Sequence, residues 1–164
     1  MNKPRVALLD LNYTLVANSG ELSYGGDANR REKERYRGWL VDLIKLMQFD
    51  QVVLITVRHK RDQEWTLQAI EKQLGWKPDF PVFNWTSLGP PEFKLLAMRE
   101  VVIPKFGDPN EVDYVAFESN MDTHKMYWQN FRINGLKAMP ATEFGDTEVK
   151  QHAGARRNGA PKLF

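Results

Sequence analysis

Cysteine is absent from this 164-residue sequence. The chain therefore has no disulfide, no thiolate nucleophile and no cysteine ligand for zinc or an iron–sulfur cluster. It also lacks any run approaching the ~20 apolar residues that a membrane span needs. The apolar stretch after the basic start, residues 6–9, is too short for a signal peptide. We expect a cytoplasmic protein with no membrane partner.

A strong excess of charge is missing too, because the formal net charge is only +2. Four basic residues and no acid lie from Lys150 onward, which leaves 19 basic and 21 acidic residues in the rest. We expect one domain over residues 1–145 and a basic, flexible tail over 146–164. A basic tail also attracts polyanions, and that alternative stays open.

The sequence also lacks a glycine-rich phosphate-binding loop. Neither GxGxxG nor GxxxxGK[ST] occurs in the sequence, so a nucleotide-binding domain built on such a loop has no support.

Short apolar runs alternate with segments of helical periodicity. The strand candidates are residues 6–10, 52–56, 81–85, 114–117 and 136–139. The helix candidates are residues 30–47, 62–74, 93–103 and 122–131, with a loop over 17–29. This alternation predicts an α/β fold, a three-layer Rossmann-like parallel sheet with helices on both faces.

Ligands of such sheets gather at the carboxyl ends of the strands, so the polar residues there are the site candidates. Those residues are Asp10, Asn12 and Thr14 after the first strand, Thr56, Arg58 and His59 after the second, and Glu118, Asn120 and Asp122 after the fourth. Lys94 lies in the helix before that fourth strand. Each alone has an ordinary explanation as a cap, a strand residue or a surface charge.

Their order along the chain resembles the motifs of the haloacid dehalogenase superfamily. The run Asp10-Leu11-Asn12-Tyr13-Thr14-Leu15 is similar to the first motif, Asp-x-Asp-x-Thr. Thr56 resembles the second motif, Lys94 the third, and residues 118–122 the acidic fourth. The resemblance covers residues 6–140 and implies a member with little or no cap, because no inserted domain separates the motifs. An open site of this kind implies large substrates.

A finer resemblance is to phosphatase domains of the polynucleotide kinase-phosphatase type. Their second motif runs Ser/Thr-Gly-Arg, and here it is Thr56-Val57-Arg58. Their fourth motif runs Phe-Asp-Asp-Arg, and here Phe117-Glu118-Ser119-Asn120 stands in its place. The partner implied is a phosphorylated small molecule, a nucleotide or a nucleic-acid end.

The resemblance implies a Mg²⁺-dependent phosphomonoester hydrolase that acts through an aspartyl-phosphate. Asp10 would be the nucleophile, and Mg²⁺ would lie between Asp10, the main-chain carbonyl of Asn12 and Glu118, with Asp122 directly or through water. Thr56 and Lys94 would hold phosphate oxygens during catalysis. Thr14, Arg58 and Asn120 would contribute to substrate binding.

Three departures from the family pattern leave the activity open. Asn12 stands where the acid–base Asp is usual, and such acid–base help is typically worth about 10²–10⁴-fold. Tyr13 replaces a small glycine, and Glu118 is one methylene longer than Asp. The chain is then a slow phosphatase, with His59 or the substrate as acid, a catalyst of other aspartate chemistry, or a binding or regulatory module on an impaired scaffold.

Basic and aromatic residues bear on the partner. The run 58–61, the tail, Trp65 and Trp85 would suit a nucleic acid, with charge on phosphates and rings on bases. The alternative is that both tryptophans belong to the core. The near-neutral charge of the body argues against a strong nucleic-acid binder.

Overall fold

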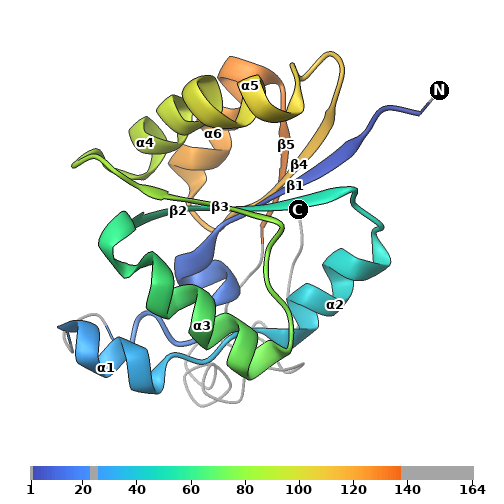
Figure 1. The fold of residues 1–164 in the computed structure, drawn as a ribbon. Helices are drawn as coiled ribbons and strands as arrows, with labels where there is room; N and C mark the ends of the chain where they lie inside the picture. The colour runs from blue at the N-terminus through green and yellow to red at the C-terminus, as the bar shows by residue number, and fades with distance from the viewer. Residues whose placement is uncertain (1, 23–25, 138–164) are drawn as a thin grey trace, which may run out of the picture.

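The computed structural model describes residues 2–22 and 26–137. Its strands are β1 (Arg5–Leu9), β2 (Gln51–His59), β3 (Phe80–Asn84), β4 (Asp113–Phe117) and β5 (Asn134–Leu136). All neighbouring strands run parallel, in the order β3-β2-β1-β4-β5 (Figure 1). The predicted Rossmann-like α/β fold is confirmed.

Strand β1 lies at the centre of the sheet, between β2 and β4. Leu9 pairs with Leu54 on one side and with Phe117 on the other. The chain builds β2 and β3 outward on one side of β1 and then returns to build β4 and β5 on the other. The direction of winding therefore reverses between β1 and β4, which is where open α/β sheets bind their ligands.

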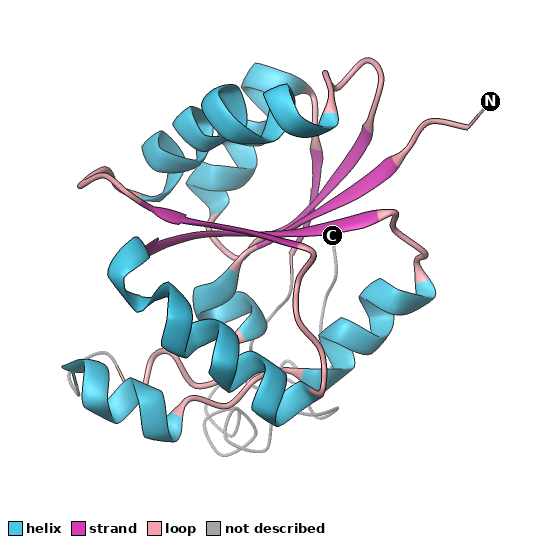
Figure 2. Ribbon diagram, viewed as in Figure 1, coloured by secondary structure: helices cyan, strands magenta, loops and turns pink. Residues whose placement is uncertain are grey.

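Helices cover both faces of the sheet (Figure 2). The helices are α1 (Gly26–Lys33), α2 (Gly38–Leu46), α3 (Gln63–Leu74), α4 (Pro90–Ala97), α5 (Ile103–Phe106) and α6 (Met121–Phe131). In Figure 1, α1, α2 and α3 lie on one side and α4, α5 and α6 on the other. Short helical turns follow β1 and β2, and a wider turn, Met98–Val102, joins α4 to α5.

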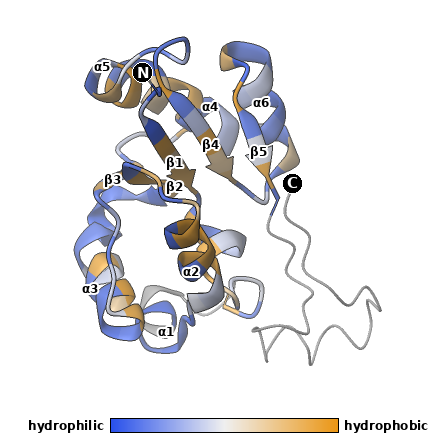
Figure 3. Ribbon diagram, turned by 90° about the vertical axis from the view of Figure 1, so that its right-hand side faces the viewer, coloured by the Kyte–Doolittle hydropathy of each residue, from blue (hydrophilic) through white to orange (hydrophobic). Residues whose placement is uncertain are grey.

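The core has two layers because alternate residues of a strand point to opposite faces. Val6 and Leu8 of β1 pack with residues of α4 and α6, whereas Ala7 and Leu9 pack with residues of α2 and α3. Figure 3 shows hydrophobic residues on the central strands of the sheet. Within the described ranges, no helix is long and apolar enough to cross a membrane.

The prediction of one helix over residues 30–47 is wrong. Two helices, α1 and α2, are separated by residues 34–37, and α1 begins inside the loop predicted over 17–29. The break has a physical reason: Tyr36 forms an antiparallel bridge with Val16, and the charged side chains of Glu34 and Arg37 are buried. Apolar spacing continues through this segment, so periodicity alone does not reveal the break.

Other boundaries shift by a few residues. Strand β2 continues to His59 rather than ending at Thr56, with an irregular register against β3 between Ile55 and His59. The helical run after β3 reaches Phe106 rather than residue 103, and β5 begins two residues before the predicted start. Residues 138–139 of the predicted last strand, and the predicted tail over 146–164, lie outside the described residues.

Candidate active site

The candidate site lies where β1 and β4 end side by side. Asp10 directly follows β1, and its backbone N–H donates to the carbonyl of Phe117, the last residue of β4, at 2.9 Å. Glu118 directly follows β4. Parallel pairing therefore brings two acidic residues that are 108 positions apart to the same edge of the sheet, at the point where the winding reverses.

Lys94 of α4 links these two acids. Its Nζ lies 2.7 Å from Oδ1 of Asp10 and 2.5 Å from Oε2 of Glu118. All three side chains are buried, so the ion pairs are poorly screened by water. Burial alone would lower the pKa of Lys94, but Asp10 and Glu118 together raise it above its usual value. The ammonium therefore stays charged, and the buried triad carries a net negative charge when both acids are ionised.

The Glu118 carboxyl resists ionisation. Burial and the neighbouring Asp10 raise its pKa to about 8, although Lys94 acts in the opposite direction. Its second oxygen, Oε1, accepts a hydrogen bond from the backbone N–H of Asn120 at 3.1 Å. Two buried carboxylates sharing one cation are a typical cause of such a shift. A further cation placed beside Glu118 would therefore favour its ionised form.

Thr14 holds Asp10 from the protein side. The turn Leu11–Leu15 places the buried Thr14 hydroxyl 2.8 Å from Oδ2 of Asp10 and 3.0 Å from Oγ of Ser119. Both Asp10 oxygens thus have a partner, Lys94 for one and Thr14 for the other. The structure places Thr14, a predicted substrate ligand, where it orients the predicted nucleophile.

Thr56 lies one strand away from Asp10. Leu54 of the neighbouring strand β2 pairs with Leu9, the last residue of β1, so Thr56 lies two residues beyond the end of β1. Its Oγ1 accepts a hydrogen bond from the backbone N–H of Arg58 at 3.0 Å, which leaves the hydroxyl proton to donate elsewhere.

Arg58 is buried and forms an ion pair that the sequence did not reveal. Its guanidinium contacts both oxygens of Glu34, at 2.9 and 2.5 Å, and donates to Thr66 Oγ1 at 3.0 Å. It also lies over the half-buried ring of Trp65, 4.9 Å from the centroid. Arg58 is thus turned toward the protein, whereas a role in substrate binding was predicted. No spacing signal points to Glu34, since it lies in the unexpected break between α1 and α2.

Asn12 belongs to the same network. Its Oδ1 accepts a hydrogen bond from Nη2 of Arg58 at 2.8 Å, and the side chain is half-buried. Because the side-chain oxygen of Asn12 is bound to Arg58, its NH₂ group is the part of the amide that can donate to a further partner. This position thus offers a hydrogen-bond donor but no exchangeable acid.

The start of α6 holds the other two predicted residues. Asn120 is the N-cap of α6, and its side-chain oxygen accepts from the backbone N–H of Thr123. Asp122 lies exposed in the first turn. Among residues 2–22 and 26–137, no three His, Asp or Glu side chains gather closely enough to hold a metal. Asp122 is therefore not brought to Asp10 and Glu118.

A magnesium site fits the remaining donors. Asp10 and Glu118 offer carboxylate oxygens that converge on one point, now taken by the Lys94 ammonium. Mg²⁺ is commonly held by one or two carboxylates, with water and substrate phosphate completing the shell. The oxygen donors of this pair thus suit Mg²⁺, whose charge would favour the ionised form of Glu118, and Asp122 is not needed for it.

Sequence reasoning also missed two residues beside Glu118. His124 lies with Nε2 2.6 Å from the main-chain oxygen of Glu118 and fixes the backbone there. The Tyr127 hydroxyl is buried and has no hydrogen-bond partner among the residues that the structure describes. Burial raises the pKa of Tyr127, so it stays neutral beside Lys94. Both residues lie on α6. The apolar spacing of that helix in the sequence indicates which face is buried but not which polar groups on it reach the site.

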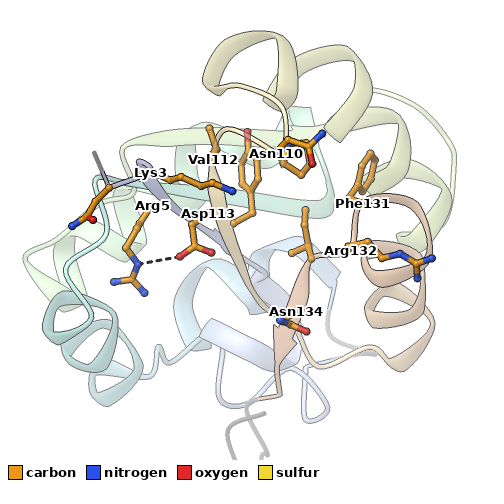
Figure 4. Close-up of a pocket in the computed structure, with 12 residues that line it drawn as sticks. Lys3, Arg5, Asn110, Val112, Asp113, Phe131, Arg132 and Asn134 are labelled. Carbon is orange, nitrogen blue, oxygen red and sulfur yellow. Dashed lines mark hydrogen bonds and ion pairs between the residues drawn. The ribbon is translucent and has the colours of Figure 1, made fainter.

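A pocket of about 600 Å³ opens at the opposite edge of the sheet, at the amino ends of β1, β4 and β5 (Figure 4). Arg5 on its wall pairs with Asp113, and Arg132 lies over the ring of Trp128. Both arginines on its wall thus have partners. The buried charges converge at the carboxyl edge instead, and we assign the site there.

The fold and this geometry define the class of protein. It is an α/β protein with a parallel sheet, in which a lysine bridges two acids at the switch point, the place between β1 and β4 where the direction of winding reverses. The sequence matches no family model, and no curated protein matches it.

The chain is similar in structure to two solved structures. A chain of the Pnkp1/Rnl/Hen1 RNA repair complex superposes with a TM-score of 0.67 at 16% identity, over 84% of this chain and 43% of that one. A second structure of the Pnkp1/Rnl/Hen1 complex gives a TM-score of 0.62 at 15% identity, over 85% and 47%. This chain thus spans less than half of those chains, and at such identity the likeness shows the fold alone.

Proposed function

We propose that this protein is a Mg²⁺-dependent hydrolase of phosphomonoesters at nucleic-acid ends. One observation carries the proposal: Lys94 bridges Asp10 and Glu118 at the switch point of the sheet. The motif order along the chain agrees with this chemistry. The similarity to chains of an RNA repair complex supports a nucleic-acid end as the substrate.

Asp10 is the nucleophile in this proposal. One of its carboxylate oxygens attacks phosphorus, an Asp–O–P bond forms, and the ester P–O bond to the leaving oxygen breaks. Thr14 and Lys94 hold the carboxylate while it reacts. Water then attacks the phosphorus and loses a proton to solvent, the Asp–O–P bond breaks, and inorganic phosphate leaves with the Asp10 carboxylate restored.

Lys94 and Thr56 stabilise the transferring group. The Lys94 ammonium and the Thr56 hydroxyl offset the charge on the equatorial phosphate oxygens. Asp10 and Glu118 would hold Mg²⁺, which when bound neutralises further phosphate charge. Asn12 offers an amide hydrogen bond but no proton to the leaving oxygen, so that proton comes from solvent and the reaction is slow.

The test is phosphate release from RNA and DNA oligonucleotides bearing a 3′- or 5′-phosphate, and from an aryl phosphate, with Mg²⁺ or with EDTA. We expect turnover that needs Mg²⁺ and that Asp10→Asn abolishes. Asp113→Asn, at the other end of the sheet, is the matched control and should retain activity. Unchanged turnover in Asp10→Asn would sink the proposal.

A second candidate is a binding or regulatory module on an impaired scaffold. The observation in its favour is that Asn12 is an amide locked to Arg58. Absence of turnover on every substrate above, together with oligonucleotide binding, would favour this candidate. A gain of phosphatase activity on Asn12→Asp would instead show that the other groups are in working order.

A further inference from the structure

Exposed apolar side chains lie at the same edge of the sheet as the candidate site. Large apolar side chains that are 42–52% exposed follow the ends of three strands: Tyr13 after β1, Trp85 and Leu88 after β3, and Met121 after β4. Because the strands are parallel, all four lie at the carboxyl edge, on the same side as Asp10. Exposed apolar residues grouped beside a polar site mark a binding surface.

Cations separate the two aromatic residues. Strand β2 lies between β3 and β1, and its end continues into Lys60 and Arg61. Both are exposed, and the Arg61 side chain, which is 71% exposed, makes a long 3.9 Å contact with Asp62. Along the edge the order is therefore Trp85, then Lys60 and Arg61, then Tyr13 beside Asp10. We call these four residues the aromatic–basic strip.

Trp85 is held in place rather than loosely exposed. The buried Asn84 donates to the carbonyl of Leu88 and accepts from the backbone and hydroxyl of Thr86, which fixes the loop after β3. The Trp85 ring meets Phe93 edge to face, with centroids 5.2 Å apart. Phe93 immediately precedes Lys94, so the same helix α4 positions both the ring and the site cation. This loop lies at the left of Figure 1.

Tyr13 occupies a backbone conformation that a bulky residue rarely adopts. Its φ is 62°, in the left-handed region that favours glycine. The conformation is enforced from both sides, since its N–H donates to Ser19 Oγ at 2.8 Å and its carbonyl accepts from Arg37 at 2.9 Å. A bulky residue kept in a strained conformation points to a function for its half-exposed ring. Glycine would fit this backbone with less strain but would remove the ring.

We propose that the aromatic–basic strip binds a single-stranded polynucleotide and leads its terminal phosphate to Asp10. Trp85 and Tyr13 stack on bases, and Lys60 and Arg61 contact the phosphates between them. Strands β3 and β1 are two strand spacings, about 10 Å, apart across the sheet. The end of β3 is level with His59 of β2, five residues beyond Leu54, which pairs with the last residue of β1, so it also lies about 16 Å further along the strand direction. The polynucleotide therefore crosses the sheet edge obliquely. Flat rings alternating with cations are the surface that single strands require. This inference rests on the proposed function and deepens it.

The test measures binding without turnover, in the full-length Asp10→Asn protein. A fluorescein-labelled single-stranded oligonucleotide, RNA or DNA, is titrated by anisotropy. Trp85→Ala should weaken binding about tenfold, as expected for the loss of one stacked base. Trp85→Phe keeps a stacking face and should stay within about threefold of the parent on the same grounds. Trp128→Ala is the control, because Trp128 is 48% exposed but lies along α6, outside the strip.

The contribution of Lys60 and Arg61 is measured separately, from the salt dependence of binding. Replacing Lys60 and Arg61 by Ser should reduce the slope of log Kd against log salt by about 0.7 for each phosphate that is no longer neutralised. Equal affinities of Trp85→Ala and Trp128→Ala, or an unchanged salt slope, overturn the inference. Turnover of aryl phosphate without oligonucleotide binding also overturns it and leaves the hydrolase proposal standing. Self-association that Trp85→Ala abolishes would instead assign the surface to a second copy of the chain.

Discussion

Arg58 donates a hydrogen bond of 2.8 Å from Nη2 to the side-chain oxygen of Asn12. The same guanidinium is paired with Glu34, so its charge is balanced inside the protein. The residue at position 12 is therefore oriented by Arg58, which its ion pair with Glu34 holds in place. This relationship decides what a change at position 12 would do.

Asn12→Asp should accelerate hydrolysis of an oligonucleotide phosphate by about 100-fold, the low end of the range for general acid–base catalysis. The gain is limited because Arg58 favours the ionised form of the new carboxyl, which is a weak proton donor. An aryl phosphate, whose leaving group needs little protonation, should gain less. Steady-state rates with both substrates check this. An equal gain for both substrates would contradict the acid–base explanation.

Lys94→Met should lower the free energy of unfolding by about 3–5 kcal/mol in the absence of metal. Removing the ammonium leaves the buried carboxyl groups of Asp10 and Glu118 without their cation, which is the costly way to break a buried ion pair. Urea denaturation followed by circular dichroism measures the loss. Lys72→Met, at an exposed position on α3, is the control and should change stability little. A loss no larger than that of the control would show that Lys94 is not the cation that balances this pair.

The metal-free protein should lose stability as the pH rises from about 4.5 to about 8. Burial and Asp10 raise the pKa of Glu118 to about 8 in the folded protein, above its ordinary value of 4.5. The folded state thus binds more protons than the unfolded state across this range, and its stability falls as they are released. Thermal unfolding in EDTA at several pH values checks this.

Glu118→Gln should flatten that pH dependence, because the amide does not titrate. Mg²⁺ should oppose the loss in the parent protein, since a bound cation favours the ionised carboxylates. An equally steep pH dependence in Glu118→Gln would place the responsible group elsewhere.

Gly135→Ala should disturb the site from a distance. A Cβ at Gly135 would collide with the His124 ring, and it is His124 that fixes the main-chain oxygen of Glu118. The ring must move, so we expect weaker Mg²⁺ binding by isothermal titration as well as a lower melting temperature. His124→Ala combined with Gly135→Ala removes the clash. If the double variant melts no higher than Gly135→Ala alone, the collision is not the cause.

The place of the site could be predicted because it depends on strand order and on residues next to strand ends. Asp10 and Glu118 follow apolar runs that are clear in the sequence, and parallel pairing then brings them together. The bridging position of Lys94 depends on the packing of α4, which apolar spacing does not specify. The break at Glu34 was hidden for the same reason: Tyr36 continues the helical pattern although the backbone there is extended.

Side-chain exposure was the other property that the sequence did not reveal. Trp65 and Trp85 look alike in the sequence, yet Trp65 is half-buried over Arg58 and Trp85 is 44% exposed. Asp122 lies at the spacing of the fourth motif but is exposed in the first turn of α6. Such differences depend on tertiary packing and turn geometry, which a single sequence does not encode locally.

The reversal of winding between β1 and β4 has a kinetic consequence. Asp10 comes from the first half of the chain, and Lys94 and Glu118 come from the second, so the triad forms only after β4 docks against β1. That pairing closes a loop of more than 100 residues, a contact of high sequence separation that forms slowly during folding. A refolding intermediate holding only β1, β2 and β3 would have most of the core layer that packs against α2 and α3, but not the triad of Asp10, Lys94 and Glu118. Recovery of the proposed hydrolase activity would thus report the final docking of the two halves, not the initial collapse.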